Sequence, residues 1–570
     1  MEILLINLMR LGDLVQTLPV IRGLKARYPE ARLTLLVMDL FGEAARLLPG
    51  IHRLLPFPGT ALAPVLDREG WPAAVDGLDR WLKENLRPAP DLAINLTPTL
   101  LGGLLARLSQ APRLRGLWVS DSRELVTAPG WASYSLVVSK ARQANPFNVA
   151  DLFVLGAGLR PDGQGVALAA DQEAGSPTHP RVPPGTRVIG LCPGASRPER
   201  QWPPERFAQM ARLLLPEGPA HFVILGSAGE RPLGEAILRA LPAGTGTLLA
   251  GETSLPELRR RLAALDLLIT NDTGPMHLAA AVGIRVLALF LASARVRDTG
   301  PAGRGHVALE PHLPCHPCLR PCPRPRCHEA LPPEVVAAVA REMLAGREPA
   351  PREAPPGWET VRMYATQMDP GGCLAALPVL RRPLSREEFW LWVHRLAWEK
   401  FFSPAPPPGL EEWLRDLLQE RYLPPADDLG LPRSLAALWE LGTLARRGEE
   451  TAARLARMAL EADQPPLRLS MALSTLTAVD QGLRRLAAQF PELAAVVEFF
   501  FQDQRLLRDR DPAGLARELS RAYRRLWRLA EVCEAAAVHL APGALPLPFY
   551  LAQVMHLKPP AARCGSAEAR

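Results

Sequence analysis

Apolar and polar positions along the first 345 residues alternate in short blocks that predict strands and helices in turn. Continuous apolar runs such as 3–8, 32–38 and 265–269 are typical of buried parallel strands. Segments between them, such as 14–28, carry apolar residues at helical spacing. Strands that alternate with helices at this interval predict an α/β fold built on doubly wound parallel sheets.

The pattern changes after residue 384, where helical spacing continues and strand-like runs stop. Ser385 and Glu388 have the spacing of a capping box and open a helix that runs to about residue 402. An aromatic stripe on this helix is expected to be core. The remaining helices are expected at roughly 410–422, 434–447, 450–462, 467–490, 492–507 and 513–541.

Loop-rich stretches divide the chain into three folded parts. Residues 170–185 are rich in Pro, Gly, Ser and Asp, and residues 346–357 hold four prolines. The expected organisation is a Rossmann-like unit over 1–175, a second over 186–345, a Pro-rich linker over 346–380 and an all-helical domain over 381–560. One further strand is expected at 360–369.

Composition limits the class of protein and its surroundings. The 570 residues carry a formal net charge of +7, and no apolar run reaches the roughly 18 residues of a membrane-spanning helix. The first residues lack the basic region of a signal peptide, so we expect a cytoplasmic location with peripheral contact to the inner membrane as an option. Basic residues are not interleaved with aromatics, so the pattern gives no support for nucleic-acid binding.

The stretch 270–277 (TNDTGPMH) follows one predicted strand and precedes a helix. Such a turn directs free backbone N–H groups toward one point, where the helix dipole favours an anion. Asp272 or Thr273 can cap the helix, and Gly274 permits close approach of a ligand. The residues alone leave two interpretations open, a phosphate site and an ordinary turn.

Asp13 follows the first predicted strand, at the sheet edge where α/β proteins bind ligands. A carboxylate there can act in catalysis, or it can simply cap the next helix. Neither α/β unit has a G-x-G-x-x-G sequence after its first strand, which argues against a dinucleotide-dependent dehydrogenase.

Four cysteines gather in the Pro-rich loop 312–330, whereas the other four are scattered. Cys315, Cys318, Cys322 and Cys327 provide four soft ligands that could hold one structural zinc ion. Their spacing differs from the paired C-x2-C of zinc ribbons. Free thiols or a redox pair are the alternatives.

Three segments together resemble glycosyltransferase family 9, the bacterial heptosyltransferases of lipopolysaccharide core assembly. They are residues 10–19 (RLGDLVQTLP), 193–203 (PGASRPERQWP) and 271–279 (NDTGPMHLA), and many family members also carry a Cys-rich loop near residue 320. The resemblance covers about residues 1–345. It does not extend to the helical domain, which looks like an addition to the family's usual length.

The resemblance implies a GT-B fold, in which two Rossmann-like domains face each other, and an inverting reaction that needs no metal cofactor. Asp13 then looks like the catalytic base, with Arg10 and Gly12 on the acceptor side. The donor and its phosphates would be bound by Ser196, Arg200, Asp272, Thr273, Gly274 and His277. The family usually has lysine where Arg200 stands and often a hydroxyl residue where Ala195 stands.

The function that this resemblance implies is transfer of a sugar, heptose from ADP-heptose, to a lipopolysaccharide core or lipid A-type acceptor. Two alternatives stay open: a transferase that uses another nucleotide sugar and a non-lipid acceptor, and a transferase-like scaffold without catalysis. The appended helices motivate the first alternative, because such a domain can bind a protein partner, whereas the intact Asp13 and Asp272 motifs argue against the second. Composition and motifs do not define the purpose of residues 381–560.

Overall fold

The structure is a computed structural model of the 570-residue chain. It describes residues 1–120, 123–127, 130–138, 141–168, 182–318, 322, 325–403, 405–426, 429–461, 466–507 and 511–542. The predicted domain boundary at 170–185 lies mostly outside these residues. In the described part of the chain, no helix combines the length and the apolar character that a membrane crossing requires.

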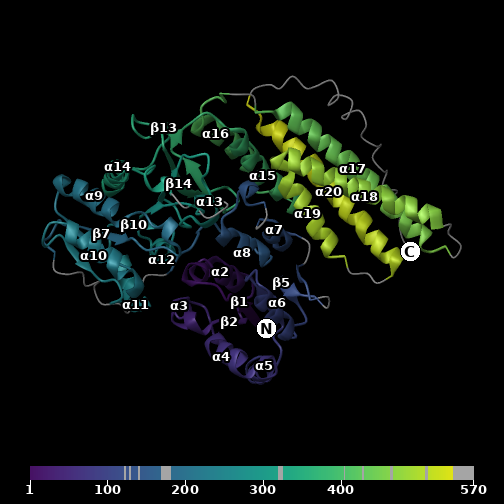
Figure 1. Ribbon diagram of the computed structural model, residues 1–570, viewed down its shortest axis with the longest axis horizontal. Coiled ribbons are helices and arrows are strands. Elements are labelled where there is room, and N and C mark those ends of the chain that lie inside the picture. Colours follow the sequence, from purple (N-terminus) through teal and green to yellow (C-terminus); the bar gives the residue numbers. More distant parts are fainter. Residues whose placement is uncertain are drawn as a thin grey trace.

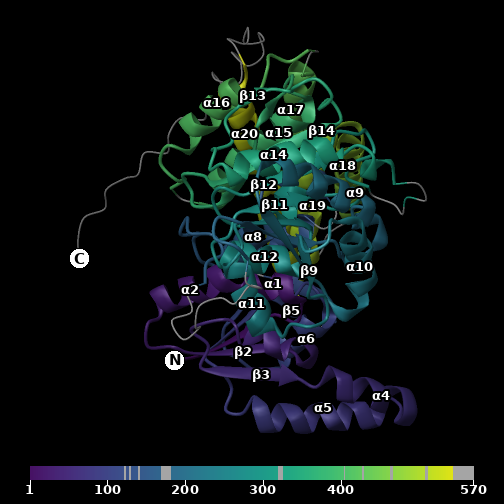
Figure 2. The ribbon, with the colours of Figure 1, turned by 90° about the vertical axis from the view of Figure 1, so that its left-hand side faces the viewer.

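The first unit is built on a six-stranded sheet in the order β3-β2-β1-β4-β5-β6, parallel except for the β5–β6 pair. Its strands are β1 (Glu2–Ile6), β2 (Arg32–Met38), β3 (Arg53–Phe57), β4 (Leu92–Asn95), β5 (Leu114–Val119) and β6 (Leu125–Thr127). Its helices are α1 (Leu11–Val15), α2 (Leu18–Arg27), α3 (Gly42–Ala45), α4 (Gly59–Glu69), α5 (Trp71–Asn85), α6 (Leu100–Leu108), α7 (Trp131–Val138) and α8 (Val149–Gly156). Short 3-10 turns are η1 (Asp39–Phe41) and η2 (Arg142–Ala144). Figure 2 shows α4 and α5 side by side below β3.

The second unit is built on an eight-stranded sheet in the order β15-β14-β12-β11-β10-β7-β8-β9. Its strands are β7 (Arg187–Cys192), β8 (Ala220–Ile224), β9 (Gly246–Leu248), β10 (Leu267–Asn271), β11 (Val286–Leu289), β12 (Val307–Pro311), β14 (Val361–Met368) and β15 (Leu374–Pro378). Its helices are α9 (Pro204–Leu214), α10 (Arg231–Ala240), α11 (Leu255–Ala263), α12 (Gly274–Ala281), α13 (Val296–Thr299) and α14 (Pro333–Leu344), with 3-10 turns η3 (Pro198–Arg200), η4 (Leu215–Glu217), η5 (Ala228–Glu230) and η6 (Arg326–His328). Two doubly wound units in tandem are the GT-B architecture.

The interpretation of 346–380 as a linker was wrong for most of its length. The hairpin β14–β15 adds two antiparallel strands to the edge of the second sheet beside β12. Strands β13 (Arg352–Glu353) and β16 (Leu380–Arg381) pair with each other. The prolines that suggested a linker precede the hairpin, whereas Val361, Met363 and Leu377 are buried in apolar clusters.

The helical region comprises α15 (Arg386–Phe402), α16 (Leu410–Arg421), α17 (Leu431–Met458), α18 (Pro466–Gln489), α19 (Ala494–Arg505) and α20 (Pro512–Leu540), with the turn η7 (Pro491–Leu493) before α19. The two helices expected at 434–447 and 450–462 form one helix, α17. Gly448 lies inside this helix and is buried, and a β-carbon on it would clash with the Tyr523 ring of α20.

Helix α15 joins the helical region to both α/β units, which lie to its left and below it in Figure 1. Its aromatic side chains are core, as predicted: Trp390, Trp392 and Trp398 are each at most 2% exposed. The same apolar cluster includes Phe147 of the first unit and Leu377 of the second. The helical region therefore shares a hydrophobic core with the two α/β units.

Candidate active site between the two sheets

The loops after β1 and β10 meet where the two α/β units face each other. Helix α1 begins after β1 and α12 begins after β10. The two helices touch so closely that a β-carbon on Gly12 would lie 2.8 Å from His277 Cδ2. One on Gly274 would lie 2.9 Å from Leu11 Cδ2. Residues far apart in sequence are thus brought into one site.

Asp13 is the third residue of α1, and Arg10, not Asp13, occupies the N-cap position. The Asp13 carbonyl accepts hydrogen bonds from Asn7 Nδ2 (3.2 Å) and Thr17 Oγ1 (3.0 Å), which hold this turn in place. Burial raises the pKa of the Asp13 carboxyl to about 6, and Arg10 opposes that rise. A carboxylate with this pKa is ionised at neutral pH and is still basic enough to accept a proton.

Asp272, between β10 and α12, has the same raised pKa. Burial raises the pKa of Asp272 to about 6; Arg200, Thr299 and Arg142 act against the rise, and the nearby Asp13 adds to it. Arg200 Nη1 lies 3.6 Å from Asp272 Oδ2. The site therefore contains two carboxylates that repel each other, and Arg200 and Arg142 partly offset this repulsion at Asp272.

Arg200 is held in place by the end of η3 and by Ser293. The Ser293 hydroxyl accepts hydrogen bonds from Arg200 Nε (3.0 Å) and Nη2 (2.8 Å). The residue before it, Ala292, has a positive φ of 53°, an uncommon conformation for a residue with a side chain. Ser196, by contrast, is exposed to solvent on the loop before η3. Arg200 is thus fixed toward Asp272, and Ser196 is accessible.

The start of α12 has N–H groups that no side chain caps. Thr273 is the N-cap residue, but its side chain makes no capping hydrogen bond, contrary to the expectation that Asp272 or Thr273 caps the helix. Burial lowers the pKa of His277 to about 4, so its imidazole is neutral at pH 7. Attraction for an anion at this end must come from backbone N–H groups and Arg200, not from a charged His277.

Asn271, the last residue of β10, holds the loop after β7 in place, a role that was not predicted from its position in the motif. Its buried amide donates to the carbonyl of Pro193 (2.8 Å) and accepts from the Trp202 N–H (3.1 Å). Trp202 is fully buried and donates to the Leu331 carbonyl (3.2 Å), so it packs rather than binding ligand. A buried amide directly after a strand is the signal that could have identified Asn271.

Arg142 and Asp298 join the two units beside Asp272, and no motif in the chain points to either of them. Arg142, in η2 of the first unit, donates to Asp298 of α13 in the second. Asn145 Nδ2 also donates to Asp298 (3.3 Å), and Arg295 Nη1 donates to the Arg142 carbonyl (2.6 Å). Arg142 acts on both Asp272 and Arg200 electrostatically. Only the fold brings these residues together.

The four clustered cysteines lie in the segment between β12 and α14. Burial, and then the three other thiols, raise the pKa of Cys318 to about 11. Among the residues that the structure describes, no three His, Cys, Asp or Glu side chains are arranged to hold a metal ion. The thiols as placed do not form the expected tetrahedral site, and zinc binding stays a prediction. The loop contacts the site through His328, whose Nε2 lies 2.9 Å from the Glu199 carbonyl.

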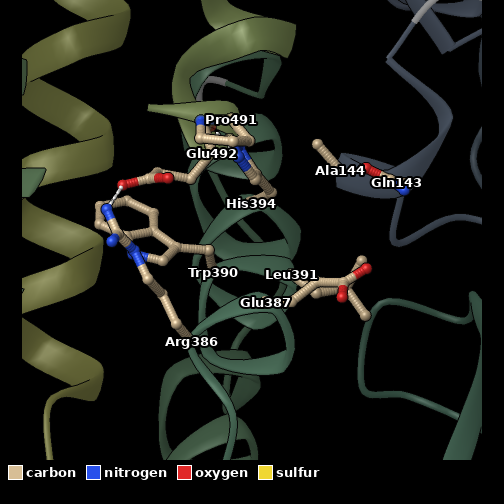
Figure 3. A pocket seen from close by; sticks show the side chains of 9 residues that line it. All are labelled: Gln143, Ala144, Arg386, Glu387, Trp390, Leu391, His394, Pro491 and Glu492. Carbon is tan, nitrogen blue, oxygen red and sulfur yellow. Dashed lines mark hydrogen bonds and ion pairs between the residues drawn. The ribbon is translucent and has the colours of Figure 1, made fainter. Parts of the chain in front are cut away.

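A pocket of about 380 Å³ lies next to Arg142, between η2, α15 and η7 (Figure 3). It is lined by Gln143, Ala144, Arg386, Glu387, Trp390, Leu391, His394, Pro491 and Glu492. His394 Nε2 lies 2.8 Å from the Glu492 carbonyl and must donate to it, so the neutral ring has an unprotonated Nδ1. Burial lowers the pKa of His394 to about 4, which keeps the ring neutral.

Comparisons with known proteins agree with these features. The family model for glycosyltransferase family 9 (heptosyltransferase) matches residues 80–328. Over these residues the chain is similar to glycosyltransferase family 9. It is 28% identical over 304 residues to lipooligosaccharide heptosyltransferase 2 of Haemophilus influenzae, covering 51% of this chain and 83% of that protein. It is also 28% identical over 313 residues to lipopolysaccharide heptosyltransferase 2 of Salmonella typhimurium, covering 51% and 82%.

Among solved structures, the chain is similar to the Escherichia coli ADP-heptose lps heptosyltransferase II, with a TM-score of 0.46 and 20% sequence identity. That match covers 61% of this chain and 99% of the other. The sequence relatives indicate a glycosyltransferase related to the lipopolysaccharide heptosyltransferases, with further helices. The family model includes Arg200 and Asp272, whereas Asp13 precedes the matched residues.

Proposed function

We propose that this glycosyltransferase transfers heptose from ADP-heptose to a hydroxyl of a lipopolysaccharide core or lipid A-type acceptor. The choice of heptose is supported by the relatives, which are named heptosyltransferases. The observation that carries the catalytic proposal is Asp13, a carboxylate with a pKa of about 6 at the contact between the two units.

In the proposed reaction, the Asp13 carboxylate accepts the proton of the acceptor hydroxyl as its oxygen attacks the anomeric carbon. The bond from that carbon to the diphosphate breaks as the new bond forms, and the configuration inverts. A nucleoside diphosphate leaves, and its growing negative charge requires stabilisation. Arg200 and the uncapped N–H groups of α12 supply it.

Asp272 has a positioning role in this scheme. Its carboxylate faces Arg200 and keeps the guanidinium at the N-terminus of α12. Ser293 holds the same guanidinium from the other side. Ser196 and Thr273 are then available to donate hydroxyl hydrogen bonds to the diphosphate.

The experiment that tests the base is Asp13→Asn, which keeps the size of the side chain and removes its basicity. Loss of a general base costs roughly 10²–10⁴ in rate. We expect transfer to fall by that factor, while the affinity for ADP, measured by calorimetry, stays within about threefold. The matched control is Asp76→Asn on the exposed face of α5. Transfer by Asp13→Asn at the normal rate would show that Asp13 is not the base.

Donor and acceptor are tested separately with the full chain. Thermal shifts with ADP-heptose, UDP-glucose and GDP-mannose compare the three nucleotides, and we expect the largest shift with ADP-heptose. Transfer is then assayed on a lipid A-type acceptor that carries core sugars. A larger shift with a UDP- or GDP-sugar would refute the donor, and transfer to protein alone would refute the acceptor.

A further inference from the structure

The first half of α18 exposes several apolar side chains to solvent, whereas the second half buries its large apolar side chains. Leu467 is 71% exposed and Met471 is 62% exposed. The exposed apolar residues at this end of the helical region are Leu460, Leu467, Leu469, Met471 and Leu473. An exposed apolar cluster on a folded protein marks an interaction surface.

Basic side chains line a groove directly beside this cluster. The groove, of about 660 Å³, runs between the last turns of α17 and the first turns of α18. Its charged lining consists of Arg447, Glu450, Arg454, Arg457, Glu461 and Arg468. The four guanidinium groups outnumber the two carboxylates. In the described part of the chain, none of the four arginines forms an ion pair, and all four are exposed.

The positions of these residues make one amphipathic surface. Arg447, Arg454 and Met458 recur along one face of α17, at spacings of seven and four residues, which are about two turns and one turn of a helix. Arg468 and Met471 face them from α18. On the other side of α18, Leu469 and Leu473 lie among serine and threonine side chains. Figure 1 shows α17 and α18 side by side, running away from the two α/β units.

We propose that this surface, the groove arginines and the exposed first half of α18, docks on an anionic lipid bilayer. Arginine binds phosphate through paired N–H groups, and the adjacent apolar side chains enter the boundary between headgroups and acyl chains. A second copy of this chain is a poorer partner, because face-to-face contact would bring two sets of unpaired arginines together. The docking does not depend on the identity of the donor or acceptor.

The test is co-sedimentation of the full chain with vesicles of phosphatidylcholine alone or with 30 mol% phosphatidylglycerol. We expect binding to the anionic vesicles, little binding to the neutral ones, and weaker binding as salt is raised. Each basic residue near such a surface contributes about 1 kcal/mol. Arg454→Gln with Arg457→Gln should therefore lower the partition coefficient by roughly 30-fold.

Two further variants separate the parts of the surface from general charge effects. Leu467→Ser with Met471→Ser removes the exposed apolar side chains on the groove side of α18, and at about 25 cal/mol per Å² of apolar area we expect at least tenfold weaker binding. Arg212→Gln with Arg239→Gln is the matched control, because it removes the same charge from exposed ends of α9 and α10. It should bind as the unchanged chain does.

Several results would overturn the proposal. These are no binding to the anionic vesicles, equal binding of the groove variant and the control, or unchanged binding of the serine variant. Competition between free inorganic phosphate and the vesicles is a separate measurement. If millimolar phosphate abolishes vesicle binding at constant ionic strength, the groove takes a soluble anion and the bilayer is not its partner. Transfer activity plays no part in these measurements, so their failure would leave the proposed reaction intact.

Discussion

Gly12 and His277 are in contact although they belong to different α/β units. A β-carbon on Gly12 would lie 2.8 Å from the His277 ring, closer than real side chains come. His277 is 4% exposed, so its ring has no free space to move into. The missing side chain at position 12 therefore sets how closely α1 approaches α12, and with it the separation of Asp13 and Asp272.

We expect Gly12→Ala to separate the two helices and lower transfer at least about tenfold. Overpacking of this kind costs about 1–3 kcal/mol of folding free energy. His277→Ala opens space for the new methyl group, so the double variant should recover part of the activity lost by Gly12→Ala. Steady-state kinetics and urea unfolding of the four proteins measure this coupling.

Gly42→Ala in α3 is the matched control, because no atom lies within 4 Å of the site where its β-carbon would be. It should change neither activity nor stability appreciably. If the effects of the Gly12 and His277 substitutions are additive, the contact between these residues is not the cause of the activity lost in Gly12→Ala.

The pH dependence of transfer should report the raised pKa of Asp13. The base acts only when it is ionised, so kcat/KM should fall as the pH decreases through about 6. An ordinary aspartate would give this decline near pH 4. Because Asp272 has a similar pKa, the decline becomes steeper than tenfold per pH unit if both carboxylates must be ionised. A flat profile from pH 8 to pH 4.5 would contradict both assignments.

The same pH range affects folding, so each activity value needs a stability measurement. Burial lowers the pKa values of His277, His306 and His394 to about 4. The unfolded chain takes up protons at these histidines below about pH 6.5, before the native state does. Their contribution to stability is therefore lost as pH falls from 6.5 toward 4. Fluorescence-monitored unfolding at each pH distinguishes this loss from titration of the base.

Asp13 should also destabilise the fold at neutral pH. Its native pKa of about 6 lies above the ordinary value, so the native state binds the proton more tightly than the unfolded chain. Stability from this group is complete below about pH 4 and declines as pH rises to 6. We expect Asp13→Asn to be about 1–2 kcal/mol more stable than the unchanged chain at pH 7.5, and equally stable at pH 4. A variant that is less stable at pH 7.5 would show that ionised Asp13 is not a destabilising group in the native state.

Arg142 should affect the donor side of the site from the opposite unit. Its charge lowers the pKa of Asp272, and its guanidinium holds Asp298. We expect Arg142→Ala to raise the KM for the donor about tenfold and to move the acid decline in activity to higher pH. Arg142→Lys, which keeps the charge, should leave that decline in place. Kinetics over pH 5–8 measure both effects, and an unchanged KM for Arg142→Ala would refute the role.

Periodicity in the sequence was enough to predict the α/β class of both units, because most of the buried parallel strands near the site are short apolar runs. The turn at Asp272 and the loop at Asp13 were also predictable, since each directly follows such a run. The hairpin β14–β15 was mostly missed, although one strand at 360–369 was expected. Nothing local shows that Val361 continues a sheet whose preceding strand ends at Pro311.

The partners of the site were harder to predict than its motifs. Arg142 and Asp298 meet only because η2 of one unit reaches α13 of the other. Two helices were expected at 434–447 and 450–462, but Gly448 between them is helical, and the close approach of Tyr523 requires a glycine there. In each case the deciding contact joins residues distant in sequence, and periodicity contains no information about such contacts.

Arg395 of α15 connects the helical region to both α/β units. It is 3% exposed in its side chain and its Nε donates to Asp369 Oδ2 at 2.8 Å, while Nη1 lies 3.3 Å from Glu399. Asp369 follows β14 in the second unit, and the guanidinium also lies over the Phe147 ring of the first, at 4.8 Å. Removing one partner of a buried pair costs about 3–5 kcal/mol, because the other charge is left unpaired.

We therefore expect Arg395→Met to lower the free energy of unfolding by that amount at pH 8, measured by urea denaturation. Arg433→Met on the exposed face of α17 is the control and should cost less than about 0.5 kcal/mol. A deficit for Arg395→Met below about 1 kcal/mol would mean that apolar packing of α15, rather than this ion pair, holds the helices to the catalytic body.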